Sequence, residues 1–324
     1  MVADTTRRIG VAPRPEPPEP ESDQAARARR RRRRQARSRA FTGWAFAGPG
    51  TLFVVGLSFF PAVWAFLIAR TKWNGIAPPR DVGWGNYASM RDDPQLWDAV
   101  RHTATLTALF VPSSIVIGLI VAIALNQKVR FITFYRTCIF VPFVASAAAT
   151  GILASYVFNP QFGSANELLR RLGIPAQQFL ENPHQVLVVI CVIALWGEIG
   201  FTAVIYLAAL QDIPRDLVEA ATVDGAKRWQ VFRHITLPEL RPVTVFAVIW
   251  QTITALQIFD LVFTTTKGGP LGSSETIVYY IYELAFQTQR YGYGSAVGYG
   301  LFAVTMLLTI GMVLYSRRAK VEAF

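Results

Sequence analysis

The side chains best suited to acid–base or metal chemistry are three histidines, and they are scattered along the chain. His102, His184 and His234 have no cysteine or acid at a metal-ligand spacing. The chain contains no GxSxG nucleophile motif, and no phosphate-binding loop of the form GxxxxGK followed by Ser or Thr. The sequence therefore predicts no covalent catalysis, no metal site and no ATP binding through such a loop.

One carboxylate indicates a different chemistry, the recognition of a polar solute. Glu198, in the stretch LWGEIGF, lies in the middle of a long apolar segment. A charge inside a membrane costs roughly 2.5–3.5 kcal/mol on insertion scales, so such residues are usually functional. Trp196 and Phe201 beside it could stack on an apolar face of such a solute while the carboxylate accepts hydrogen bonds from its polar groups. A structural hydrogen bond within the helix bundle is the alternative, and both interpretations stay open.

A polar set on a later apolar segment could complete the wall of such a path. Three side chains there fall within an arc of about 120° at 100° per helical residue. Thr and Gln also form hydrogen bonds between membrane helices, so helix packing is the alternative interpretation. Asp260 lies near the outer end of this segment, close to water, and is not assigned to the path. The predicted substrate path consists of Trp196, Glu198, Phe201, Gln251, Thr254 and Gln257.

Six apolar segments would have to position these side chains. Each is about 20 residues long and almost uncharged, which suits a helix that crosses a bilayer. The segments cover residues 44–69, 104–126, 137–157, 186–210, 241–263 and 296–316. With both termini in the cytoplasm, 23 of the 32 lysines and arginines lie on the cytoplasmic side, in agreement with the positive-inside rule. The sequence predicts an all-α membrane protein with six transmembrane helices.

The loop at 211–241, between the fourth and fifth segments, has the signals of ordered structure. It reads QDIPRDLVEAATVDGAKRWQVFRHITLPELR. Pro214 suits the first turn of a helix, and Gly225 suits the left-handed or close-packed backbone that ends one. A second short helix follows and closes near Pro238. The pattern predicts a helix–turn–helix-like projection, with an ordinary amphipathic helix at the membrane surface as the alternative.

The motifs of this loop resemble the EAA signature of the membrane subunits of ABC importers. The residues that carry it, before the stretch FRHITLP, are Glu219, Ala220, Ala221, Asp224, Gly225 and Ala226. Four further stretches resemble the MalF-type subunit of carbohydrate importers: NPQFGSANELLRRLGIP, LAALQDIPRDLVEAA, IFDLVFTTTKGGP and IYELAFQTQRYGYGSAVGYG. The resemblance covers about residues 100–316. Lys267 departs from relatives that often have glycine before GGP.

The resemblance implies the architecture of a type I ABC importer permease, in which this loop is the coupling helix that enters a cleft of an ATPase. The implied partners are a second EAA-type permease subunit in a heterodimer, two copies of the ATPase, an extracytoplasmic sugar-binding protein, the sugar and membrane lipid. The chain would hold no cofactor and would not be an enzyme, since ATP and Mg²⁺ would bind to the ATPase.

The chain divides into two parts near residue 40. Residues 1–40 contain a Pro- and acid-rich tract and then an Arg-rich run, which predict a disordered cytoplasmic arm in contact with anionic lipid. The arm has the pattern of neither a folded nucleic-acid-binding domain nor aromatic residues interleaved with basic ones, so its sequence does not predict nucleic-acid binding. Residues 41–324 form the predicted permease domain, with an EAA-type core at about 100–316. We expect a multi-pass protein of the cell (inner) membrane with both termini in the cytoplasm.

Three other functions are less well supported. An ABC permease of this kind could carry a glycerol phosphodiester or another polar solute. An ion-coupled secondary transporter would be favoured by inverted repeats with broken midplane helices, and no such repeat is recognisable. A membrane-embedded enzyme would need a group of catalytic residues, and the sequence shows no motif of that kind.

Overall fold

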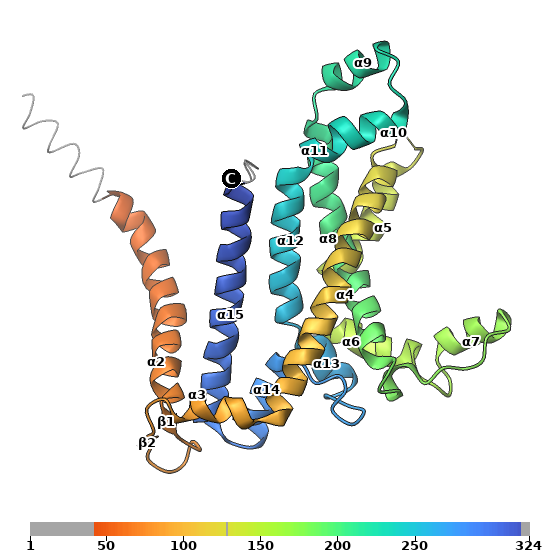
Figure 1. Ribbon diagram of the computed structural model, residues 1–324. Helices are drawn as coiled ribbons and strands as arrows, with labels where there is room; N and C mark the ends of the chain where they lie inside the picture. The colour runs from red at the N-terminus through yellow and green to blue at the C-terminus, as the bar shows by residue number, and fades with distance from the viewer. Residues whose placement is uncertain (1–41, 128, 319–324) are drawn as a thin grey trace, which may run out of the picture. The chain divides into compact units, whose positions relative to one another are not determined.

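The computed structural model describes residues 42–127 and 129–318, which are mainly helical (Figure 1). The predicted arm at 1–40 and the last six positions, 319–324, lie outside the described residues. The described residues divide into two units, with the boundary between Trp64 and Ala65.

The described part of the first unit is one helical run with a widened turn. The run begins at Thr42, and its turn η1 (Val55–Phe59) is π-helical. The backbone N–H that follows η1 donates to a carbonyl five residues back, at Val55. Pro61 comes next and has no N–H to donate, which favours a locally widened helix at this point.

The second unit contains the longer helices that surround the candidate site. They are α4 (Pro94–Leu125), α5 (Ile132–Val144), α6 (Ala147–Val157), α8 (Val186–Asp212), α12 (Arg241–Leu256) and α15 (Tyr291–Arg318). The helix α2 (Phe60–Ala69) leads into this unit. A two-stranded antiparallel hairpin, β1 (Thr71–Lys72) and β2 (Arg80–Asp81), follows α2.

Short helices connect the longer ones. The α-helical pieces are α3 (Gly85–Ser89), α7 (Ser164–Arg171), α9 (Arg215–Val223), α10 (Arg228–Val231), α11 (Leu237–Glu239), α13 (Asp260–Thr265) and α14 (Ile277–Tyr282). The 3₁₀ and π-helical pieces are η2 (Met90–Asp92), η3 (Phe179–Glu181), η4 (Phe232–Thr236) and η5 (Glu283–Gln287).

Five helical runs among the described residues are long and apolar enough to cross a bilayer. They are Thr42–Ala69, Pro94–Leu125, Val186–Asp212, Arg241–Thr265 and Tyr291–Arg318. They correspond to five of the six predicted spans, so the prediction of a multi-pass helical membrane protein is confirmed. The second run begins earlier than predicted because Asp93 caps it, accepting a 3.2 Å hydrogen bond from the N–H of Leu96.

The third predicted span, 137–157, is not one continuous helix. It consists of α5 and α6, whose axes differ by 99°. The described residues contain a sixth candidate span only if this bent pair is counted as one span. Ala145 and Ser146 between them have extended backbone. Pro142 lies in the last turn of α5 and cannot donate a helical hydrogen bond, which weakens the helix where it ends. The sequence prediction missed this break because both halves are equally apolar.

The pair α4 and α8 forms the centre of the second unit. At their crossing, a Cβ on Gly118 would lie 2.5 Å from Cγ2 of Thr202, so only glycine allows the two backbones to approach this closely. Large buried side chains of both helices, including Phe110 and Ile190, continue into a core shared with α6, α13 and α14. The small residues of α6 contribute buried Thr150 and Gly151 to this region.

At the end of this unit opposite α9, the start of α4 is tied to α14 and α15. The hydroxyl groups of Tyr280 and Tyr293 donate to Oδ2 of Asp93 over 2.6 Å and 2.5 Å. Burial alone would raise the pKa of Asp93, but the hydrogen bonds from the two tyrosines and from the Leu96 N–H outweigh it and hold this pKa below its usual value.

A second carboxylate, Glu275, is buried at the same end, in the segment between α13 and α14. Only 7% of it is exposed, and its Oε1 accepts a 3.0 Å hydrogen bond from Nε2 of Gln95. Its backbone carbonyl lies 3.2 Å from Nδ1 of His102. Burial is the main cause that raises the pKa of Glu275, the hydrogen bond from Gln95 lowers it and the charge of Glu283 raises it, and the result is a pKa of about 7 in place of 4.5.

The raised pKa of Glu275 makes the stability of this end depend on pH. The folded state binds the carboxyl proton of Glu275 more tightly than the unfolded chain does. The contribution of this group to the free energy of unfolding is therefore complete below pH 4.5 and is lost as the pH rises through about 7. We expect Glu275→Gln to flatten the decline of the unfolding temperature across this interval, measured on the purified protein in detergent. The exposed Glu181→Gln is the control. A decline as steep in Glu275→Gln as in the parent would contradict the assignment.

Candidate functional site

The loop between α8 and α12 forms a separate projection. In Figure 1, α9 extends beyond the ends of α8 and α12, and α10 and α11 return the chain to the start of α12. Within the projection α9 has no buried residue, whereas α8 is buried along much of its length. The helix–turn–helix-like projection predicted for 211–241 is confirmed.

The turn after α9 has the hydrogen bonds of a Schellman motif. The N–H of Ala226 donates to the carbonyl of Ala221 over 2.9 Å, and the N–H of Gly225 donates to Thr222 over 3.1 Å. Gly225 has a φ of +81°, as predicted for a left-handed residue at this point. No atom lies within 4 Å of the position where its Cβ would be, so backbone conformation alone restricts this position.

The predicted coupling residues lie together on this turn and the helix before it. Glu219, Ala220, Asp224 and Gly225 are exposed, and Ala221 and Ala226 are half-buried. Small side chains on an exposed helix allow another surface to approach the backbone closely, and the carboxylates offer charge to a basic partner. The geometry agrees with a docking surface, while the role of these residues in coupling stays a prediction.

The second helix of the loop is less regular than predicted. It begins at α10, where the N–H of Lys227 donates to Oε1 of Gln230 over 2.7 Å, and then widens into the π-helical turn η4. Pro238 lies one turn further on and has no N–H for the carbonyl of His234. This missing donor favours the change of helical pitch before Pro238.

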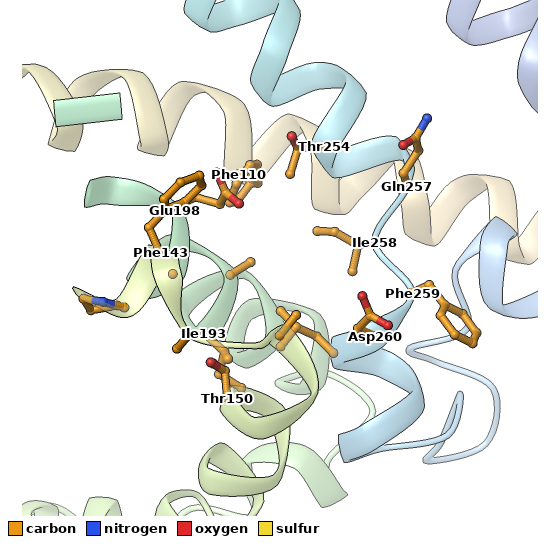
Figure 2. A pocket seen from close by; sticks show the side chains of 16 residues that line it. Phe110, Phe143, Thr150, Ile193, Glu198, Thr254, Gln257, Ile258, Phe259 and Asp260 are labelled. Atoms are coloured by element: carbon orange, nitrogen blue, oxygen red, sulfur yellow. The ribbon is translucent and has the colours of Figure 1, made fainter. Parts of the chain in front are cut away.

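A cavity of about 220 Å³ lies where the break between α5 and α6 meets α8 and the join of α12 and α13 (Figure 2). Most of its wall is apolar, with Phe110 from α4 and Phe143 from α5 on one side. The remaining lining residues are Pro142, Ala145, Ala147, Thr150, Ile193, Ala194, Gly197, Glu198, Thr254, Gln257, Ile258, Phe259, Asp260 and Leu261.

Three of the six predicted path residues line this cavity. Glu198 reaches it from α8, Thr254 from the end of α12, and Gln257 from the residues that follow α12. Figure 2 shows the side chains of Glu198, Thr254 and Gln257 around one opening, with Asp260 on the opposite wall from Glu198. Asp260 was not assigned to the path from the sequence, because it lies near water at the end of its apolar segment. In the structure it lines the cavity together with Ile258.

Gln251 does not line the cavity but lies fully buried beside it. Its Nε2 donates to Oγ1 of Thr202 over 2.7 Å, and this hydroxyl shares a 3.1 Å hydrogen bond with Oγ of Ser114. Three helices, α4, α8 and α12, therefore meet at one hydroxyl group. Thr202 is also one turn after Glu198 and bonds to its backbone carbonyl over 3.3 Å. The network holds Gln251 against the part of α8 that faces the cavity.

The two predicted aromatic residues have different surroundings. Phe201 stacks on Phe143, a cavity residue, with ring centroids 5.0 Å apart, and also lies 5.2 Å from Trp250. It therefore supports the wall from behind and does not itself line the cavity. Trp196 is 48% exposed and lines a separate apolar cavity of about 280 Å³ between α6 and α8.

The residues that the sequence prediction missed come from elements it could not bring together. Phe110 reaches the cavity from α4 and Phe143 from the last turn of α5, and Asp260 reaches it at the start of α13, after the three residues that separate α13 from α12. A sequence signal existed for one of them. Pro142 marks a weak point in the third apolar segment, and Phe143 is its neighbour.

Among the described residues, several helices can cross a membrane and an ordered helical loop follows one of them. Residues 114–321 match the family model of the binding-protein-dependent transport system inner membrane component. A solved bacterial ABC transporter involved in the import of the acidic polysaccharide alginate has the same fold. The match has a TM-score of 0.78 at 23% identity, over 89% of this chain and 99% of that one.

Characterised relatives match over most of their length. The lactose transport system permease protein LacF of Rhizobium radiobacter is 32% identical over 86% of this chain and 95% of the relative. The diacetylchitobiose uptake system permease protein NgcF of Streptomyces coelicolor is 33% identical over 84% of this chain and 81% of the relative. The chain belongs to the family of membrane components of binding-protein-dependent transport systems, the permease subunits of ABC transporters.

The left-handed backbone of Gly225 gives a direct test of the loop. A β-branched residue resists a φ of +81°, whereas asparagine tolerates it, and neither side chain meets another atom there. We expect Gly225→Val to lower labelled-solute uptake at least tenfold at equal abundance in the membrane, and Gly225→Asn to keep most of it. Parental uptake by the valine variant would show that the shape of this turn does not matter for transport.

Proposed function

We propose that this chain passes a sugar or oligosaccharide from an extracytoplasmic binding protein into the cytoplasm. The cavity beside Glu198 is the observation that supports this most directly. Its wall combines a carboxylate, the hydroxyl group of Thr254 and the amide of Gln257 with the rings of Phe110 and Phe143. A sugar presents hydroxyl donors together with an apolar ring face, and such a wall suits both. The lactose and diacetylchitobiose permeases among the relatives support the same substrate class.

The proposed assembly contains four other components. This chain would pair with a second EAA-type permease, and each permease loop would dock on one of two ATPase copies that bind ATP and Mg²⁺. An extracytoplasmic binding protein would deliver the sugar at the opposite end of the spans. A relative of the same fold, the alginate transporter, has been solved in complex with a periplasmic protein bound to an alginate pentasaccharide, which supports a partner of that kind.

Transport in this proposal follows alternating access. Closure of the ATPase dimer on ATP would move the two coupling loops together and turn the cavity toward the binding protein, and hydrolysis would reverse the change. The part of this chain is mechanical. Its α9 receives the movement, and α8 links α9 to Glu198 without an interruption of the helix. The chain performs no chemical step.

The proposed orientation places the loop and both termini in the cytoplasm of a cell (inner) membrane protein. The distribution of lysine and arginine supports it. After replacement of Cys138 and Cys191, we expect single cysteines introduced at 164–180 and 270–290 to react with an impermeant maleimide added to intact cells. Cysteines at 212–236 should react only after permeabilisation. Labelling of 212–236 from outside would reverse the orientation and remove the docking argument.

The role of Glu198 is tested by Glu198→Gln, which keeps the shape and one acceptor oxygen but removes the charge. A lost hydrogen bond to a charged group is worth roughly 1.5–3 kcal/mol, so we expect about a ten- to hundredfold weaker apparent affinity in sugar uptake, with abundance and unfolding temperature unchanged. Glu181→Gln, outside the cavity, is the control. A fall in thermal stability together with uptake would assign Glu198 a structural role, and parental kinetics would remove it from the site.

A further inference from the structure

The ionisable side chains that line the cavity are all acidic. Glu198 and Asp260 are its two carboxylates, and no lysine, arginine or histidine of the described residues lines it. Neither carboxylate forms an ion pair with a described basic side chain. Figure 2 places them on opposite walls, so an occupant lies between two negative groups. Such a wall cannot neutralise an anion.

An unpaired hydrogen-bond acceptor on Glu198 adds to the excess of negative charge in this cavity. Oε2 of Glu198 is buried and has no partner among the described residues. Oε1 of Gln251 also lacks a donor among the described residues, but Gln251 is 0% exposed and does not line the cavity, so this atom is not available to a solute there. A buried acceptor without a donor is unfavourable, and a solute with hydroxyl or amino groups can donate a hydrogen bond to the Glu198 carboxylate. A carboxylate on the solute would add a further acceptor.

We infer that this cavity favours neutral or amino-bearing saccharides and disfavours saccharides that carry a carboxylate, sulfonate or phosphate group. The inference rests on the proposed function and narrows its substrate class. A cavity of about 220 Å³ keeps any sugar ring close to both walls. An anionic group on a sugar in this cavity would be repelled by the two carboxylates far more strongly in the apolar surrounding than in water. An ammonium group would be attracted to the carboxylates for the same reason. The alternative solutes of the phosphate-ester class fit this wall poorly.

The test measures selectivity by charge on a matched set of sugars. The complete importer is reconstituted in proteoliposomes with its binding protein, and ATP-driven uptake is measured for lactose, maltose, cellobiose and diacetylchitobiose. The fastest neutral sugar is then compared with its amino and uronate derivatives. The affinity of the binding protein for each sugar is measured separately, and the uptake rate is corrected for the difference in affinity between the sugars. This correction isolates the selectivity of the membrane subunits.

We expect the corrected uptake of the uronate to be at least tenfold below that of the neutral sugar, which corresponds to about 1.4 kcal/mol. The amino derivative should match or exceed the neutral sugar. The double variant Glu198→Gln/Asp260→Asn should raise the uronate-to-neutral ratio at least tenfold. The pair Asp98→Asn/Glu181→Gln removes two carboxylates outside the cavity and should leave the ratio unchanged.

A second variant keeps the test decisive if the double variant does not fold. Asp260 is exposed, so Asp260→Lys changes the charge of the wall with little effect on packing, and it should raise the ratio more than Asp260→Asn does. An unchanged ratio in the Asp260 variants, or a parental importer that carries the uronate as well as the neutral sugar, overturns the inference and leaves the sugar function standing. The absence of ATP-driven uptake of every sugar, charged or neutral, contradicts the proposed function, and the inference falls with it.

Discussion

Water is absent from the hydrocarbon core of a bilayer, so each polar atom of this chain must find its partner within the protein or in a cavity. The hydroxyl group of Thr202 meets this constraint for three helices at once, because it bonds to Ser114 and Gln251 and to the carbonyl of Glu198. The close approach at Gly118 brings α4 near enough for this network to form. The position of Glu198 at the cavity depends on this arrangement, since Thr202 lies one helical turn further along the same face of α8.

The same constraint explains where the backbone is allowed to break. Extended residues at Ala145 and Ser146 would be costly against lipid, but here they lie beside the cavity, and Ala145 is part of its wall. The end of α12 shows the same relation, because Gln257 and Ile258 leave the helix and line the cavity from the other side. Two interrupted helices thus enclose a space in which a polar solute can be held between the described spans that border it.

Local patterns in the sequence were enough to predict part of this architecture. Apolar length identified the spans, Pro214 and Gly225 identified the ends of α9, and the placement of Glu198 deep in an apolar segment identified one wall of the cavity. Features set by tertiary packing were not predictable in this way. Hydropathy is the same on both sides of the 99° bend, and helical spacing placed Gln251 with Thr254 although Gln251 is enclosed by α4 and α8. Asp260 was set aside by its distance along the helix, because the end of α12 was not visible in the residue pattern.

The unbroken course of α8 has a thermodynamic consequence. From Glu198 to its end at Asp212 the helix extends about 20 Å, and α9 begins after only two further residues. A rigid rod of this kind cannot be displaced at one end without displacement at the other. If the loop docks on an ATPase as proposed, a partner that binds it more tightly in one position of α8 would change the affinity of the cavity for the proposed solute. By thermodynamic linkage, binding of the solute would then change the affinity of the loop for that partner by the same factor.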